Sequence, residues 1–133
     1  MQFTVESKAF AGALERVKPA VGGPHHALPI CQSVHLSAAE GQQVVVVRAT
    51  DLDIALEVAV PARIDAPGQA VTPYRTLLDT VKSQKGPLAV SVDANNLIIG
   101  SSKLLAQDAA NYPPSPSADD DGSALVADSQ VLG

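Results

Sequence analysis

The chain has 133 residues, the size of a single domain with one hydrophobic core. Hydrophobic residues make up 46% and aromatic residues only 3%, so the core must be built from aliphatic side chains. The single cysteine, Cys31, excludes a disulfide within the chain and fits a reducing compartment. Because we find neither a signal-peptide pattern at residues 1–6 nor an apolar run long enough to cross a membrane, we expect a cytoplasmic protein.

The net charge of −5 is unevenly distributed along the chain. Segments 7–21 and 73–85 hold six of the nine basic residues and two of the fourteen acidic ones, so together they carry +4. The remainder holds three bases and twelve acids and carries −9. The total argues against a general polyanion binder, whereas the clustering predicts one face that suits a polyanion.

The first half of the chain is predicted to form a strand, a helix and three more strands. Alternation predicts a strand at 2–6, and an apolar stripe predicts a helix over 8–21 with Ser7 as its N-cap. Pro19 should end or kink this helix. The three further strands are expected at 32–38, at 43–50, where residues 44–47 should be buried on both faces, and at 54–60, where alternation predicts a half-buried strand.

The second half repeats this order. A strand near 69–71 leads into a helix over 73–83, with Thr72 as N-cap and Pro73 at the first helical position. A hairpin follows, with strands at 88–93 and 97–100, and then a strand within 103–107. The two helices align at an offset of 64 residues through the pairs Phe10/Tyr74, Leu14/Leu78, Glu15/Asp79, Val17/Val81 and Lys18/Lys82. This repeat predicts two similar units within one domain spanning 1–112.

From Tyr112 onward the composition changes. Residues 113–123 are rich in proline, serine and aspartate, which predicts a solvated linker. Apolar residues return within 124–133, which we interpret as the start of a truncated or vestigial second domain.

No arrangement of residues is typical of an active site, because no nucleophile has a positioned base and no phosphate-binding glycine loop occurs. Asp51 and Asp53 could hold Mg²⁺, which keeps a small hydrolase or nuclease as one hypothesis, although the pair is more typical of a charged turn. His25 and His26 are adjacent and therefore point apart. We expect no catalytic residue, no metal site and no cofactor.

The two basic helices carry the strongest candidate site. Lys8 and Lys18 lie opposite the apolar stripe of the first helix, and Arg75, Lys82 and Lys85 lie opposite that of the second. If both helices pack on one sheet, these bases form one positive surface for the phosphates of DNA. The alternative is two ordinary solvated helix faces with weak local ion pairs.

Short motifs in a fixed order resemble one family. They are residues 1–6 (MQFTVE), Gly22-Gly23, Leu28-Pro29-Ile30, residues 49–53 (ATDLD), Val71-Thr72-Pro73 and Tyr112-Pro113. Together they resemble the N-terminal domain of the bacterial sliding clamp, the beta subunit of DNA polymerase III, over residues 1–127. The resemblance implies an α+β DNA-clamp fold of two βαβββ units with both helices on one side of the sheet.

The resemblance also implies a function. In this family the helices line a channel and face duplex DNA without reading its sequence, and the protein is a processivity factor without catalytic residues. Lys8, Lys18, Arg75, Lys82 and Lys85 would then contact double-stranded DNA. A homo-oligomeric ring would bind the replicative polymerase and the clamp loader through later domains, of which this sequence shows none complete.

Two positions test the resemblance against the family pattern. The loop at 22–29 is one residue longer and lacks the arginine with which the family touches DNA, whereas Lys103 keeps the basic charge after the second hairpin. The alternative function is a clamp-like binding module without ring closure, which interacts with a clamp or another replication protein.

Overall fold

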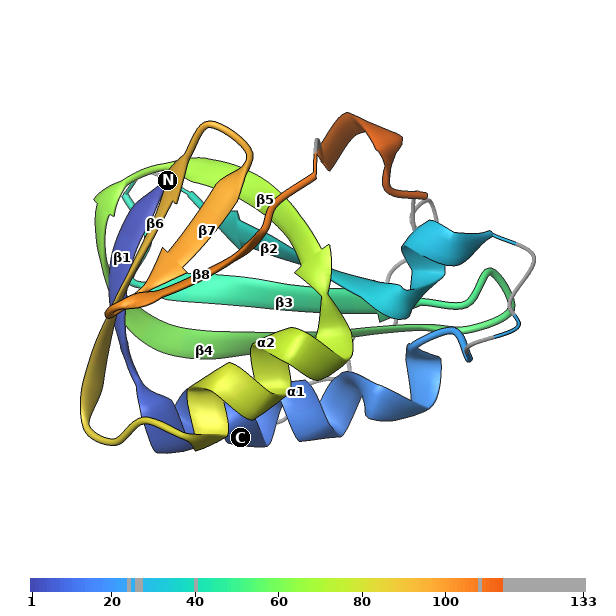
Figure 1. The fold of residues 1–133 in the computed structure, drawn as a ribbon, viewed down its shortest axis with the longest axis horizontal. Helices are drawn as coiled ribbons and strands as arrows, with labels where there is room; N and C mark the ends of the chain where they lie inside the picture. The colour runs from blue at the N-terminus through green and yellow to red at the C-terminus, as the bar shows by residue number, and fades with distance from the viewer. Residues whose placement is uncertain (24, 26–27, 40, 108, 114–133) are drawn as a thin grey trace.

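Two strand–helix–three-strand units form the domain, as the computed structural model shows for residues 1–23, 25, 28–39, 41–107 and 109–113 (Figure 1). The first unit contains β1 (Gln2–Glu6), α1 (Ser7–Val17), β2 (Ser33–Ala38), β3 (Val44–Thr50) and β4 (Ala55–Ala66). The second contains β5 (Gly68–Pro73), α2 (Tyr74–Lys82), β6 (Pro87–Asp93), β7 (Asn96–Ile99) and β8 (Ser102–Leu105). Short 3₁₀ turns, η1 (Lys18–Ala20), η2 (Pro29–Gln32) and η3 (Ala109–Asn111), lie in the connections. The predicted α+β class with two βαβββ units is confirmed.

The strands join into one antiparallel sheet in the order β5-β2-β3-β4-β1-β6-β7-β8. The first strand of each unit also pairs with the other unit: β1 lies between β4 of its own unit and β6 of the second, and β5 pairs with β2 of the first. A bridge between Val71 of β5 and Gln107, just beyond β8, joins the two edges of the sheet. The sheet therefore curls around a single core that both units build together (Figure 1).

Strand β4 differs most from its prediction. It extends to Ala66, because its first half pairs with β3 and its second half pairs with β1. Ile54 and Leu56 are exposed, whereas Val60 is buried, so the alternating half-buried pattern expected for 54–60 holds only toward its end. In β3, Val45 and Val47 are buried but Val44 and Val46 are only half-buried. Burial of 44–47 on both faces is therefore wrong, because the helices cover only the inner face of the sheet.

Both helices lie on the same side of the curved sheet, side by side (Figure 1). Their apolar stripes are buried in the common core, through Phe10, Leu14 and Val17 of α1 and Leu77 and Val81 of α2. Burying each such apolar side chain stabilises the fold by about 1.5–3 kcal/mol. The offset of 64 residues therefore reflects two equivalent helices with equivalent buried faces.

Helix α1 begins without the predicted cap. Ser7 is its first helical residue, and Glu6 holds the cap position with no side-chain hydrogen bond. The N–H of Ser7 donates instead to the carbonyl of Gly86 at 3.0 Å, so a distant backbone group takes the role of the cap. The helix ends at Val17 and continues as η1, which contains Pro19, so the predicted end at this proline is confirmed.

Helix α2 also begins differently. Thr72 belongs to β5, and its buried hydroxyl donates to the carbonyl of Leu105 at 2.7 Å, so Thr72 is not an N-cap. Pro73 stands in the cap position rather than at the first helical residue. Both cap predictions fail for one reason: each strand passes into its helix without a loop in which a capping residue could sit.

A short segment after β8 covers the outer face of the sheet. His35 of β2 and Arg48 of β3 are register partners there, and the ring of Tyr112 lies 5.7 Å from the His35 ring and 5.2 Å from the Arg48 guanidinium carbon. The Tyr112 hydroxyl accepts from the N–H of Thr50 at 3.0 Å and donates to the carbonyl of Ser33 at 3.3 Å. We call this the Tyr112 anchor.

Burial around the anchor raises the pKa of Tyr112 to about 12, so its hydroxyl remains protonated and able to donate. Arg48 also donates to the carbonyl of Pro113 at 3.3 Å. The predicted linker at 113–123, apart from Pro113, and the predicted second-domain start at 124–133 lie outside the described residues.

Tyr112→Phe should lower the free energy of unfolding by about 1–3 kcal/mol, because the buried N–H of Thr50 and the carbonyl of Ser33 both lose their partner. Urea denaturation of the 133-residue chain measures this loss. Asn111→Ala, at an exposed position of the same segment, should change the free energy by less than about 0.5 kcal/mol. Equal losses in the two variants would show that the hydroxyl does not stabilise the anchor.

His35 should make stability depend on pH. Burial lowers the pKa of His35 below its ordinary 6.5, against the opposing effect of its hydrogen bond to Gln69 at 3.0 Å. The unfolded chain therefore binds a proton at a higher pH than the folded chain does. The contribution of His35 is complete above about pH 6.5 and is lost as the pH falls through that value toward the folded pKa.

Unfolding free energies measured between about pH 8 and about pH 5 test this. The wild-type chain should lose more stability on acidification than His35→Gln does. His25→Gln removes an exposed histidine and should keep the wild-type pH dependence. An identical acid-induced loss in wild type and His35→Gln would contradict the assignment.

Candidate nucleic-acid interface

The helix pair exposes its basic residues on the side away from the sheet. The bases of segments 7–21 and 73–85 are all exposed: Lys8, Arg16, Lys18, Arg75, Lys82 and Lys85. Since the apolar faces of both helices point into the core, their charged faces share one surface. We call it the helix surface.

A shallow groove between the two helices collects three of the five predicted residues. Its lining contains the bases Lys18, Arg75 and Lys82, together with Tyr74 and Leu78; the acids Glu15 and Asp79 complete it. The hydroxyl of Tyr74 donates to the carbonyl of Leu14 at 3.0 Å, which ties the two helices together beneath the groove. Residues from both halves of the chain therefore build one site.

The other two predicted residues lie toward the start of α1. The hydrogen bond from the N–H of Ser7 to the carbonyl of Gly86 places the first turn of α1 beside the segment that follows α2. Lys8 and Lys85 are the direct sequence neighbours of these two residues, and both are exposed. All five predicted residues are thus exposed, but Lys85 lies beyond the end of α2 and is not part of its helical face.

Sequence reasoning missed the pairing of one of them. Lys82 Nζ donates to Glu15 Oε2 at 2.8 Å, an ion pair that crosses from α2 to α1. The bond to Glu15 raises the pKa of Lys82, and the bond to Lys82 lowers the pKa of Glu15. The ion pairs of the described residues are Lys82–Glu15 and Arg63–Asp65, so the weak local pairs of the alternative interpretation are not among them.

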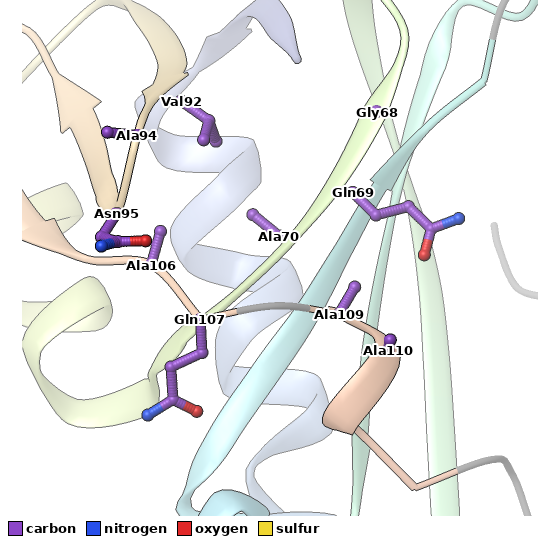
Figure 2. Close-up of a pocket in the computed structure, with 10 residues that line it drawn as sticks. All are labelled: Gly68, Gln69, Ala70, Val92, Ala94, Asn95, Ala106, Gln107, Ala109 and Ala110. Carbon is purple, nitrogen blue, oxygen red and sulfur yellow. The ribbon is translucent and has the colours of Figure 1, made fainter.

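A larger hollow of about 700 Å³ lies where the edges of the sheet meet (Figure 2). Uncharged residues of β5, of the β6–β7 hairpin and of the segment after β8 line it, and their polar side chains are the amides of Gln69, Asn95 and Gln107. Among the described residues the lining holds no charged side chain that could attract phosphate or act as an acid or a base. The hollow is therefore a weaker candidate than the helix surface.

The acidic pair at 51 and 53 forms a turn. Asp51 Oδ1 accepts from the N–H groups of Asp53 and Ile54, each at 2.9 Å, so this carboxylate organises the connection between β3 and β4. Within the described ranges no three His, Cys, Asp or Glu residues are grouped so that they could hold a metal ion. Cys31 is fully buried, and burial raises the pKa of its thiol, which disfavours the reactive thiolate.

Outside the helix surface, two further predicted positions are described. His25 is exposed, while His26 lies outside the described residues. Lys103 is exposed on β8, an edge strand of the sheet. Across the part of the chain that the structure covers, neither helix has the length and apolar character needed to cross a membrane.

Comparison with known proteins points to one family. Residues 1–115 match the family model for the N-terminal domain of the DNA polymerase III beta subunit. Among solved structures, the chain is similar to the beta sliding clamp of Caulobacter crescentus, with 29% identity and a TM-score of 0.78 over 86% of this chain and 32% of that chain. A comparison with curated proteins gives no match.

Two further clamps show the same relationship. The DNA polymerase sliding clamp from Bacillus subtilis has 25% identity and a TM-score of 0.80, over 87% of this chain and 33% of that chain. The DNA polymerase III subunit beta from Pseudomonas aeruginosa has 28% identity and a TM-score of 0.73, over 86% and 32%. The chain therefore spans about a third of the length of the clamps that it matches.

Proposed function

Because this chain belongs to the family of the DNA polymerase III beta subunit, whose N-terminal domain it matches, we propose that its helix surface faces duplex DNA inside a sliding clamp. The observation that carries the proposal is the groove between α1 and α2, where bases from both units stand together on the side away from the sheet. The protein would act in the cytoplasm as a processivity factor with no chemistry of its own.

Charge explains how such a surface works. Lysine and arginine side chains neutralise phosphates and release counterions, so binding depends on salt but not on base sequence. The rest of the chain carries −9 and repels DNA, which favours the approach of the helix surface. Few and weak contacts let a duplex slide, while a closed ring prevents its escape.

Ring closure and partners are part of this proposal. Since the chain covers about a third of each matching clamp, other domains or other copies must supply the remaining ring. The replicative polymerase and the clamp loader would bind to those parts. This domain would then contribute a segment of the channel wall rather than the docking site.

Arg75→Ala should weaken duplex binding equally for all sequences and lower the slope of log K against log salt by about one. Without a closed ring the wild-type chain should bind with a Kd on the order of 10⁻⁴–10⁻⁶ M, at the weak end because of the net charge. Fluorescence anisotropy with a labelled duplex at low salt measures both quantities.

Arg63→Ala is the matched control. Arg63 lies on β4 rather than on a helix, and its side chain is 73% exposed. Its Nε lies 3.5 Å from Oδ1 of Asp65. This variant should leave affinity and salt slope unchanged. If Arg63→Ala has the same effect as Arg75→Ala, the helix surface is an ordinary solvated face and the proposal is wrong.

The chain should have no nuclease or hydrolase activity with Mg²⁺, because the Asp51 carboxylate is engaged by two backbone N–H groups in a turn. Incubation of the purified chain with labelled single- and double-stranded DNA tests this. A robust Mg²⁺-dependent cleavage that disappears in Asp51→Asn would overturn the non-catalytic assignment.

A further inference from the structure

Lys82 differs from the other bases of the helix surface, because an acid of the opposite helix already binds it. We propose that Glu15 holds Lys82 in the interhelix ion pair and thereby removes one phosphate contact from the helix surface. Glu15 would act as a brake on DNA affinity. This inference rests on the proposed function and concerns the strength of that same site.

The ion pair has good geometry, and the positions of the two helices do not depend on it. The Lys82 Nζ to Glu15 Oε2 distance of 2.8 Å is that of a charge-assisted hydrogen bond. The spacing of the two helices is set independently of the pair, by the bond from the Tyr74 hydroxyl to the Leu14 carbonyl and by the buried contacts of Leu14 and Leu77. The pair therefore forms without pulling the helices together.

A phosphate that approached Lys82 would have to compete with Glu15. The side chains of Lys82 and Glu15 are 54% and 52% exposed, so water and salt screen their attraction and a phosphate can break it. Breaking it leaves the Glu15 carboxylate unpaired beside the incoming phosphate, and the two negative charges repel. The gain from one new contact is thus offset by a new repulsion.

Lys18 and Arg75 line the same groove but form no ion pair with another described residue. They can meet phosphates without breaking a hydrogen-bonded ion pair, although the charge of Lys18 also acts on Glu15. The groove therefore contains bases of two kinds, two that are available and one that is held. A paired base such as Lys82 suits a ligand that must slide, because it adds positive charge to the surface without adding a strong contact to any one phosphate.

Glu15→Gln tests the brake. The substitution should free Lys82 and raise the magnitude of the salt slope by about 0.9, which corresponds to about tenfold tighter duplex binding at about 50 mM salt. Asp79→Asn is the control, since it removes the same charge from the same groove without releasing a hydrogen-bonded cation. It should leave the slope unchanged.

Lys82→Gln completes a double-mutant cycle. In the wild-type chain it should leave the slope nearly unchanged, whereas in the Glu15→Gln chain it should lower the slope by about 0.9. Equal slope changes in both backgrounds would show that Lys82 meets phosphate freely, and that result would overturn the inference.

Arg75→Ala, measured in parallel, separates the two proposals. If Arg75→Ala lowers the slope but Glu15→Gln leaves it unchanged, the brake is wrong and the DNA surface stands. If neither variant changes the slope, or the wild-type chain does not bind, both are wrong.

NMR titration of the Glu15 carboxyl group in the free chain tests the ion pair without DNA. The pKa of Glu15 should lie below its ordinary 4.5 in the wild-type chain, because Lys82 donates to it, and should rise in Lys82→Gln. The same titration curve in both chains would show that the pair does not persist in solution, and the inference would fail.

Discussion

The pairing of each unit's first strand with a strand of the other unit determines how the rest of the domain is arranged. β1 lies between β4 of its own unit and β6 of the other, and β5 pairs with β2 of the other, so the strands of both units form one continuous sheet. Each of these strands passes straight into its helix, from Glu6 to Ser7 and from Pro73 to Tyr74. With no loop to redirect the chain, both helices start on the same side of the sheet. The shared core and the helix surface both follow from this connection.

The helix surface would reconcile an acidic protein with the polyanionic ligand that we propose for it. Its bases come from two segments far apart in sequence, and the packing of apolar stripes on the sheet brings them together. Its acids matter as much as its bases, because Glu15 and Asp79 stand in the same groove. A count of positive charges overstates what such a surface offers to phosphates, since one of the lysines is already bound to a carboxylate.

Repetition and periodicity predicted much of the fold. The apolar residues Phe10, Leu14 and Val17 recur as Tyr74, Leu78 and Val81, and spacing within a helix depends mainly on local sequence. Apart from Leu78, which is half-buried, all of them are buried in the core. Side-chain alternation likewise predicted the hairpin of β6 and β7.

What the sequence did not predict depends on contacts between distant segments. The cap predictions failed because the N–H of Ser7 donates to the carbonyl of Gly86 and the hydroxyl of Thr72 donates to the carbonyl of Leu105. No local sequence pattern indicates these distant partners. The length of β4 depends on a second partner, β1, that precedes it by some sixty residues. Helix periodicity gives the face of Lys8, Arg75 and Lys82, whereas Lys18 and Lys85 lie just beyond the ends of α1 and α2. The pairing of Lys82 with Glu15 depends on the register between the two helices.

The Tyr112 anchor determines where the chain leaves the domain. It fastens the chain over β2 and β3 on the outer face of the sheet, on the side away from the two helices. A connection that starts there need not pass in front of the groove. A force that pulls on the chain at this point acts on the hydrogen bonds that join the Tyr112 hydroxyl to β2 and β3. Both are interior strands, so the force does not act on an edge strand of the sheet. The segment that ends at Pro113 is thus held on the far side of the sheet from the helix surface and leaves that surface uncovered.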